Sequence, residues 1–122
     1  MNEIEAIKFF IKRVVSGKKS QRYCSIIETK KGKYKFLSEL SHGFQNSLKT
    51  DLQSIQSDKG LWSKPCYIYS SNNGFGIFIE TFLQAYDLLS SDDGWIIVSQ
   101  DAKYGFYRPE ADWDNEIRVL IQ

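Results

Sequence analysis

The sequence predicts an α+β fold: a single domain spanning residues 1–122, with an antiparallel sheet of five to seven strands packed by two or three helices. Two patterns lead to this prediction. Apolar residues recur at helical spacing near the N-terminus. The C-terminal third instead contains short segments of alternating or continuous apolar residues, which are separated by turn residues. A chain of 122 residues can also bury a core of its own, so one domain suffices.

Residues 3–15 are predicted to form an amphipathic helix that docks on the core. Charged residues such as Glu5 and Lys8 fall away from a single apolar side. Gly17 follows a basic last turn, a position typical of helix ends. The apolar side consists of Ile4, Ile7, Phe10, Ile11, Val14 and Val15.

Residues 22–37 are predicted to form a β-hairpin that turns at residues 30–32, where Gly32 allows a tight turn. The second strand would direct Tyr34 to one face and its lysines to the other. Binding of nucleic acid would require aromatic and basic side chains on the same exposed face. A solvent-facing row of lysines is therefore the favoured interpretation of this basic region.

A second helix is predicted over residues 38–56, where apolar residues recur every three or four positions. The only histidine, His42, lies about 140° from this apolar stripe by the helical period, so it is expected to be exposed. The stripe consists of Leu37, Leu40, Phe44, Leu48, Leu52 and Ile55.

The rest of the chain alternates between strands and one helix. Residues 66–70 are predicted to form a strand that ends in a turn at 71–74, and residues 75–79 could continue as strand or as helix. A helix is expected from Glu80 onward, with a polar stripe opposite its apolar one. Strands are then predicted at residues 94–100, 104–108 and 115–121.

Composition narrows the location and class of the protein. The sequence contains no stretch of 18 apolar residues of the kind that spans a membrane, and its N-terminus lacks the pattern of a signal peptide. Cys24 and Cys66 are therefore expected to be reduced thiols in a cytoplasmic protein. The net charge of +1 conceals an asymmetry, because residues 1–65 carry 13 bases and 6 acids whereas residues 66–122 carry 3 bases and 9 acids. Such asymmetry indicates a charged partner.

Residues 87–116 combine eight carboxylates with two bases and five aromatic side chains. Carboxylates steer the encounter with a basic protein, and tryptophan and tyrosine supply rigid contact area. This combination predicts a surface that binds a basic protein, and nucleic acid is disfavoured as a partner of this acidic region. The candidate partner-binding residues are Asp92, Asp93, Trp95, Asp101, Tyr104, Tyr107, Glu110, Asp112, Trp113, Asp114 and Glu116.

Two enzymatic alternatives have weaker support. Asp112, Asp114 and Glu116 would share one face of a strand and could hold Mg²⁺ or Mn²⁺, as in a small metal-dependent nuclease. A cysteine with His42 could form a nucleophile and base, although neither cysteine has a local signature. Because glycine-rich phosphate loops, paired histidines and nucleophile elbows are absent from the sequence, we expect no enzyme activity, no metal and no cofactor.

The chain resembles the small cytoplasmic immunity proteins encoded beside bacterial nuclease toxins, including those of contact-dependent growth inhibition and polymorphic toxin systems. The resemblance is one of general character, carried by the chain size, the α+β pattern and the acidic-aromatic segments SDDGW and PEADWDNE. It implies a protein that neutralises a cognate toxin domain by covering its active site and that catalyses nothing. A nucleic-acid-binding module built on the basic residues 18–35 is the remaining alternative.

Overall fold

A computed structural model describes residues 2–15, 17–39, 48–50, 60, 63–90, 92, 94–108 and 117–121, with backbone alone for Val14, 48–50 and 117–121. These residues form an α+β fold around one antiparallel sheet, as predicted. The helices and strands are α1 (Glu3–Val14), α2 (Gly17–Ile26), α3 (Lys30–Ser38), β1 (Leu48–Thr50), β2 (Cys66–Ser70), β3 (Gly74–Ile79), α6 (Phe82–Leu89), β4 (Trp95–Ser99), β5 (Tyr104–Arg108) and β6 (Ile117–Ile121).

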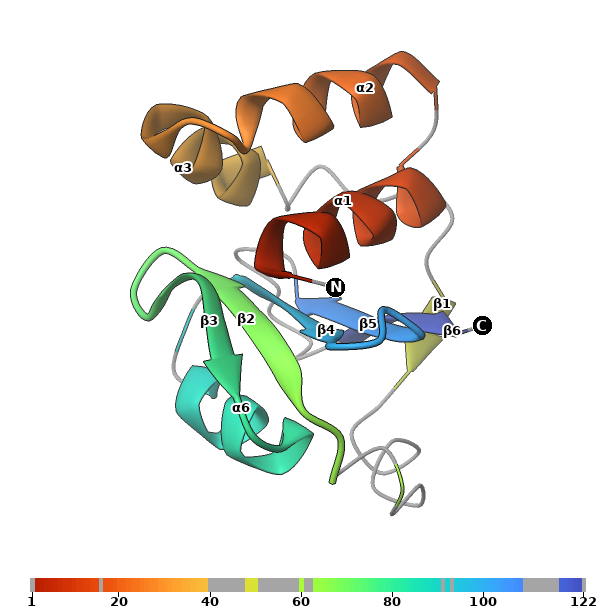
Figure 1. The fold of residues 1–122 in the computed structure, drawn as a ribbon, viewed down its shortest axis with the longest axis vertical. Coiled ribbons are helices and arrows are strands. Elements are labelled where there is room, and N and C mark those ends of the chain that lie inside the picture. The colour runs from red at the N-terminus through yellow and green to blue at the C-terminus, as the bar shows by residue number, and fades with distance from the viewer. Residues whose placement is uncertain are drawn as a thin grey trace.

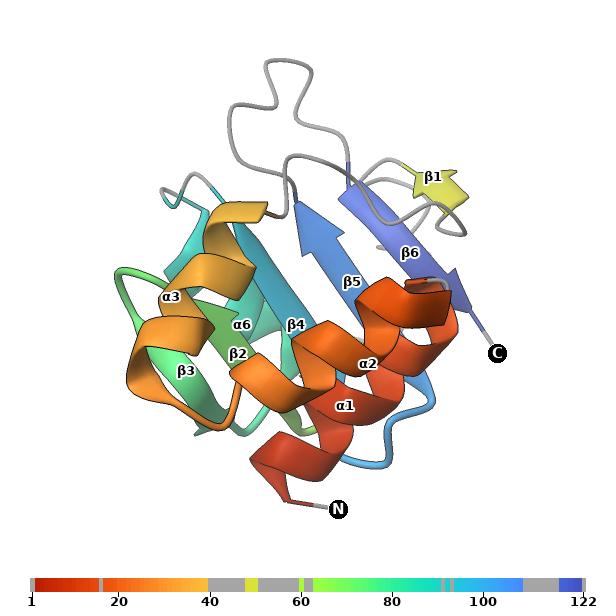
Figure 2. The ribbon, with the colours of Figure 1, turned by 90° about the horizontal axis from the view of Figure 1, so that it is seen from above.

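The sheet has the strand order β1-β6-β5-β4-β2-β3, and every neighbouring pair is antiparallel. Figure 1 shows α1 lying over one face of this sheet, with α2 farther out, and α6 lying against the opposite face. Figure 2 looks through the three N-terminal helices onto the strands. Because helices cover both faces, every residue of β2 and β4 is buried.

The helices begin where the local sequence provides a cap. The side chain of Asn2 accepts a hydrogen bond from the Glu5 amide at 2.8 Å and so starts α1. Thr29 and Thr81 cap α3 and α6 in the same way. The predicted helices over 3–15 and from Glu80 onward are therefore confirmed, with small differences at their ends.

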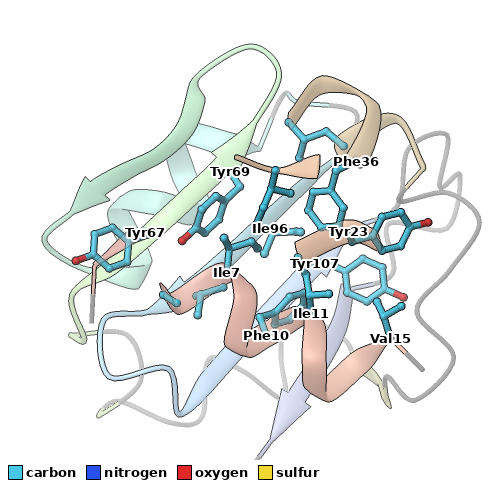
Figure 3. Packing of buried hydrophobic residues seen from close by; sticks show 14 of the residues in the cluster. Ile7, Phe10, Ile11, Val15, Tyr23, Phe36, Tyr67, Tyr69, Ile96 and Tyr107 are labelled. Atoms are coloured by element: carbon cyan, nitrogen blue, oxygen red, sulfur yellow. The ribbon is translucent and has the colours of Figure 1, made fainter. Parts of the chain in front are cut away.

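Two separate cores lie on the two faces of the sheet. On the face covered by α1, the residues Ile7, Phe10 and Ile11 pack against side chains of β2, β4 and β5 (Figure 3). On the other face, Phe82 and Leu89 of α6 pack with Trp95 and Phe106. Alternate residues of one strand therefore belong to different cores, as the strand period requires.

The predicted hairpin over residues 22–37 is wrong, because these residues form most of α2 and α3. Gly32, taken as the hairpin turn, instead lies in the first turn of α3. A Cβ added at Gly32 would lie 1.8 Å from the carbonyl oxygen of Ile26, so the missing side chain allows α3 to approach the end of α2. With α1 and α6, the described residues contain four helices rather than the predicted two or three.

The predicted helix over 38–56 is also wrong where it can be compared. Ser38 ends α3, and Leu48–Thr50 form β1, paired with β6 at the edge of the sheet. The other predicted strands are present, and residues 75–79, left open between strand and helix, belong to β3. His42 lies outside the described residues.

Candidate partner-binding surfaces

Asp92 has a structural role in joining two connections. Its side chain is buried and accepts a hydrogen bond from the Asn73 amide nitrogen Nδ2 at 2.9 Å, with Asn72 Nδ2 at 3.4 Å. These bonds connect the segment between α6 and β4 to the turn between β2 and β3. The carboxylate is therefore engaged within the protein rather than presented to a partner.

Asp101 organises the turn between β4 and β5. Its side chain accepts hydrogen bonds from the Ser99 hydroxyl at 2.7 Å and the Lys103 amide at 3.1 Å, and it pairs with Lys64 at 3.2 Å. Burial acts to raise the pKa of this carboxyl, but the three partners outweigh burial and hold the pKa below its ordinary value. Tyr104 lies beside this turn, half-buried, with the Lys64 ammonium 5.3 Å from its ring centre.

Trp95 and Tyr107 belong to the protein interior, which corrects their assignment as contact anchors. Both side chains are about 1% exposed. Trp95 packs edge-on against Tyr86 of α6, with ring centres 6.1 Å apart, and Tyr107 packs against Phe10 of α1 at 6.4 Å. The two rings therefore lie in different cores, and neither can contact a partner without unpacking.

Among the predicted site residues that the structure describes, Asp101 and Tyr104 lie together beside Lys64, but they are separated from Asp92. Asp92 precedes β4 and Asp101 follows it, so the two carboxylates lie at opposite ends of one strand. Within the described ranges, no group of three or more histidine, cysteine, aspartate or glutamate residues could hold a metal ion. The residues Asp93, Glu110, Asp112, Trp113, Asp114 and Glu116 lie outside the described residues.

The two cysteines are free thiols. Burial raises the pKa of Cys66 to about 12, and burial likewise raises the pKa of Cys24. Since the thiolate is the reactive form, both side chains are poor nucleophiles near neutral pH. The environments of the two thiols therefore do not favour the cysteine nucleophile considered from the sequence.

An exposed apolar surface, which the sequence had not indicated, lies on β3 and α6. Ile77 and Phe78 of β3 are 46% and 48% exposed, and Leu83 and Leu88 of α6 are 49% and 44% exposed. β3 is an edge strand, paired on one side with β2. We call these four residues, with the neighbouring Glu80 and Asp87, the β3–α6 surface.

The apolar residues of β3 stand on both sides of its open edge. Ile77 pairs with Ile68, which faces α6, whereas Phe78 pairs with Tyr67, which faces α1. The unpaired backbone groups of an edge strand lie between two such side chains. This arrangement suits the addition of a strand from another protein, because backbone groups would pair while side chains are covered on both faces.

The charges of the β3–α6 surface are all acidic. No lysine or arginine occurs between Lys64 and Lys103 in the sequence, whereas Glu80 and Asp87 are exposed. The outward half of α6 carries Leu83, Asp87 and Leu88 together with Gln84. The surface therefore combines apolar contact area with negative charge.

One sequence signal could have indicated this surface. The run GFGIFI contains no charged residue, a composition typical of a strand covered on both faces. At an edge, the same composition leaves apolar side chains exposed, but the sequence does not reveal which strand is at the edge. Leu83 and Leu88 fall on the polar half of the α6 wheel, a second departure from an ordinary amphipathic pattern.

No helix in the described part of the chain is long and apolar enough to cross a membrane. Comparison with known proteins does not extend these observations: no protein-family model matches the sequence, and neither curated proteins nor solved structures gave a significant match.

Proposed function

We propose that the protein is a non-catalytic inhibitor that binds a basic protein through the β3–α6 surface, and that this partner is a nuclease toxin neutralised in the cytoplasm. The observation that carries the proposal is the presence of four exposed apolar side chains on β3 and α6, within a segment (residues 74–89) whose only charged residues, Glu80 and Asp87, are acidic. Apolar area of this kind is characteristic of binding sites. The toxin identity rests on the resemblance to immunity proteins.

The acidic charges support the choice of a basic partner. Glu80 and Asp87 are exposed, and no base accompanies them on β3 or α6. A basic protein would therefore be attracted to this side, and carboxylates at the rim raise the association rate more than the final affinity. Leu83 and Leu88 would provide the contact area that slows dissociation.

The proposal differs from the sequence-based site in its contact residues. Trp95 and Tyr107 are replaced as anchors by Phe78 and the two leucines, since the former are buried in the two cores. The function itself, inhibition of a basic partner without catalysis, is unchanged.

The test uses the purified product of the neighbouring gene as the probe, because immunity proteins are encoded beside their toxins. We expect calorimetric titration to give a one-to-one complex with submicromolar Kd. The double variant Leu83→Gln/Leu88→Gln keeps helix propensity while removing apolar contacts, and it should bind about tenfold more weakly. Absence of binding by the wild-type protein would refute inhibition of that partner.

The matched control is Tyr34→Gln, which also removes an exposed apolar side chain but lies on α3, on the other side of the sheet. It should leave the Kd for the protein partner unchanged. Equal losses for the control and the double variant would exclude the β3–α6 surface as the contact site. Circular dichroism of each variant verifies that the fold is intact.

A further inference from the structure

The helices α2 and α3 form a strongly basic pair. Residues 17–38 contain seven lysines and arginines and one carboxylate, Glu28, which pairs with Lys8 of α1. Arg22 pairs with Glu39 just beyond α3, at 3.4 Å. In the described part of the chain, five exposed lysines of this pair have no carboxylate within salt-bridge distance: Lys18, Lys19, Lys30, Lys31 and Lys35.

An exposed aromatic ring lies among these lysines. By the helical period, Lys30, Tyr34, Lys31 and Lys35 fall within an arc of about 140° on α3. Tyr34 is 52% exposed, whereas Phe36 on the opposite side is buried, as is Leu37 just beyond Lys30 at the border of the arc. The helix therefore places aromatic and basic groups on one outward face, the arrangement that a hairpin over these residues would have prevented.

The relative placement of the two helices is tightly constrained. Three residues, 27–29, connect α2 to α3, and the helices form a corner in Figure 2. Gly32 allows the close approach to the Ile26 carbonyl, and Thr29 caps α3 with a 3.0 Å bond from the Gly32 amide. Lys33 lies on the inner side of α3, its ammonium 5.4 Å from the ring centre of Phe75 on β3. The lysines outside are thus presented on a packed scaffold.

We propose that the outward face of α2 and α3 binds single-stranded nucleic acid, with the lysines contacting phosphates and Tyr34 stacking on a base. Phosphate attraction accounts for most affinity in such sites, and an aromatic platform adds affinity with little sequence preference. A membrane surface would require exposed apolar residues to insert, but the apolar sides of both helices are packed inward. The proposal is independent of the β3–α6 surface.

The test measures fluorescence anisotropy of a labelled single-stranded oligonucleotide of about 20 nucleotides. We expect binding whose affinity falls about 50- to 130-fold between ~50 and ~200 mM NaCl, as four to five phosphate contacts on a single strand imply. Binding that does not respond to salt would overturn the proposal.

Matched variants separate specific contacts from general charge. Lys31→Glu should weaken binding at least about fivefold, whereas Lys103→Glu, with the same charge change in the β4–β5 turn, should have a much smaller effect. Tyr34→Ala should weaken binding at least about fivefold while Tyr34→Phe retains it, because stacking requires the ring and not the hydroxyl. Equal effects of the two lysine variants would overturn the proposed location.

Competitors distinguish nucleic acid from other anions. We expect an unlabelled oligonucleotide to displace the probe at lower concentration than polyglutamate of equal charge or vesicles rich in anionic phospholipid. Equal displacement by either, together with wild-type binding by Tyr34→Ala, would show general attraction of anions and overturn the assignment to nucleic acid. Circular dichroism of each variant confirms that a loss reflects contact rather than unfolding.

Discussion

The two faces of the sheet are covered in different ways, and their outer surfaces have opposite character. On one face, α1 packs directly on the strands, and α2 and α3 pack beside it and carry exposed lysines that form no salt bridge with a described carboxylate. On the other face, α6 presents two leucines and Asp87 beside an edge strand that exposes Ile77 and Phe78. The overall charge of +1 reflects neither surface.

This contrast indicates where a partner can bind on a small α+β protein. Once both faces of the strands are buried, aromatic residues of the central strands serve packing, however acidic their sequence surroundings are. Surface for a partner remains on the outer sides of the helices and at the edge strand. Three features of the molecule underlie this contrast: the buried aromatic rings, the α2–α3 corner and the hydrogen bonds that engage acidic residues within turns.

The largest expected effect comes from removing a buried ring. Trp95→Ala deletes a side chain that is 1% exposed and packed against α6, and should lower the free energy of unfolding by about 3–5 kcal/mol. Tyr34→Ala, on the outward side of α3, should change it by less than about 0.5 kcal/mol. Urea denaturation followed by circular dichroism measures both.

If Trp95→Ala is too unstable to purify, Trp95→Phe retains a ring and should lose only about 1–2 kcal/mol. A wild-type denaturation midpoint for Trp95→Ala would contradict the placement of this ring in the core. It would instead restore Trp95 as a candidate contact residue.

A somewhat smaller effect is expected at the corner between α2 and α3. Gly32→Ala should destabilise the protein by about 2–3 kcal/mol, because the new Cβ would meet the Ile26 backbone. The sign of the change in the free energy of unfolding is informative, because an unobstructed helix is more stable with alanine than with glycine by about 0.5–1 kcal/mol. Thermal and urea denaturation should show the loss.

Ser25→Ala on the exposed side of α2 is the control, with an expected gain or loss below about 0.5 kcal/mol. An increase in stability for Gly32→Ala would mean that the two helices do not approach each other closely. The single basic face proposed for nucleic acid would then lose its scaffold.

The sequence correctly predicted those helices and strands whose pattern of apolar residues fits only one kind of secondary structure. Residues 3–15, 66–70 and 104–108 have clear helical or strand signals, and their structures agree with them. Gly32 has two physical meanings, a turn or a close approach, and only the packing of α3 against α2 decides between them. The same ambiguity explains the incorrect hairpin.

The candidate site was harder to predict than the fold because its residues are engaged by distant partners. Asp92 is bonded by Asn73, 19 positions earlier, and Asp101 by Lys64, 37 positions earlier. Neither contact has a local signature in the sequence, so both residues were predicted to be carboxylates available to a partner. Conversely, exposure of Ile77 follows from the edge position of β3, which depends on the order of all strands.

The smallest expected effect is the response of Asp101 to acid. Its pKa is lower in the folded protein than in the unfolded chain, so its charge contributes stability above the unfolded value of about 4, and this contribution is lost as pH falls through the folded pKa. Asp101→Asn removes the titrating group and should make stability less sensitive to pH between about 5 and 2. The difference should stay below about 1 kcal/mol, because the side chain is 42% exposed and solvent screens its pairing with Lys64.

Urea midpoints at a series of pH values give this comparison, with Asp87→Asn as a control on the exposed side of α6. If both variants follow the same acid profile as the wild-type protein, then Asp101 is not held by the turn. It would then be available to a partner, as a solvated carboxylate would be. If Asp101→Asn alone makes stability less dependent on pH, then the charge of Asp101 stabilises the turn between β4 and β5 and the ion pair with Lys64. The attraction of a basic protein must then come from Glu80, Asp87 and other exposed carboxylates.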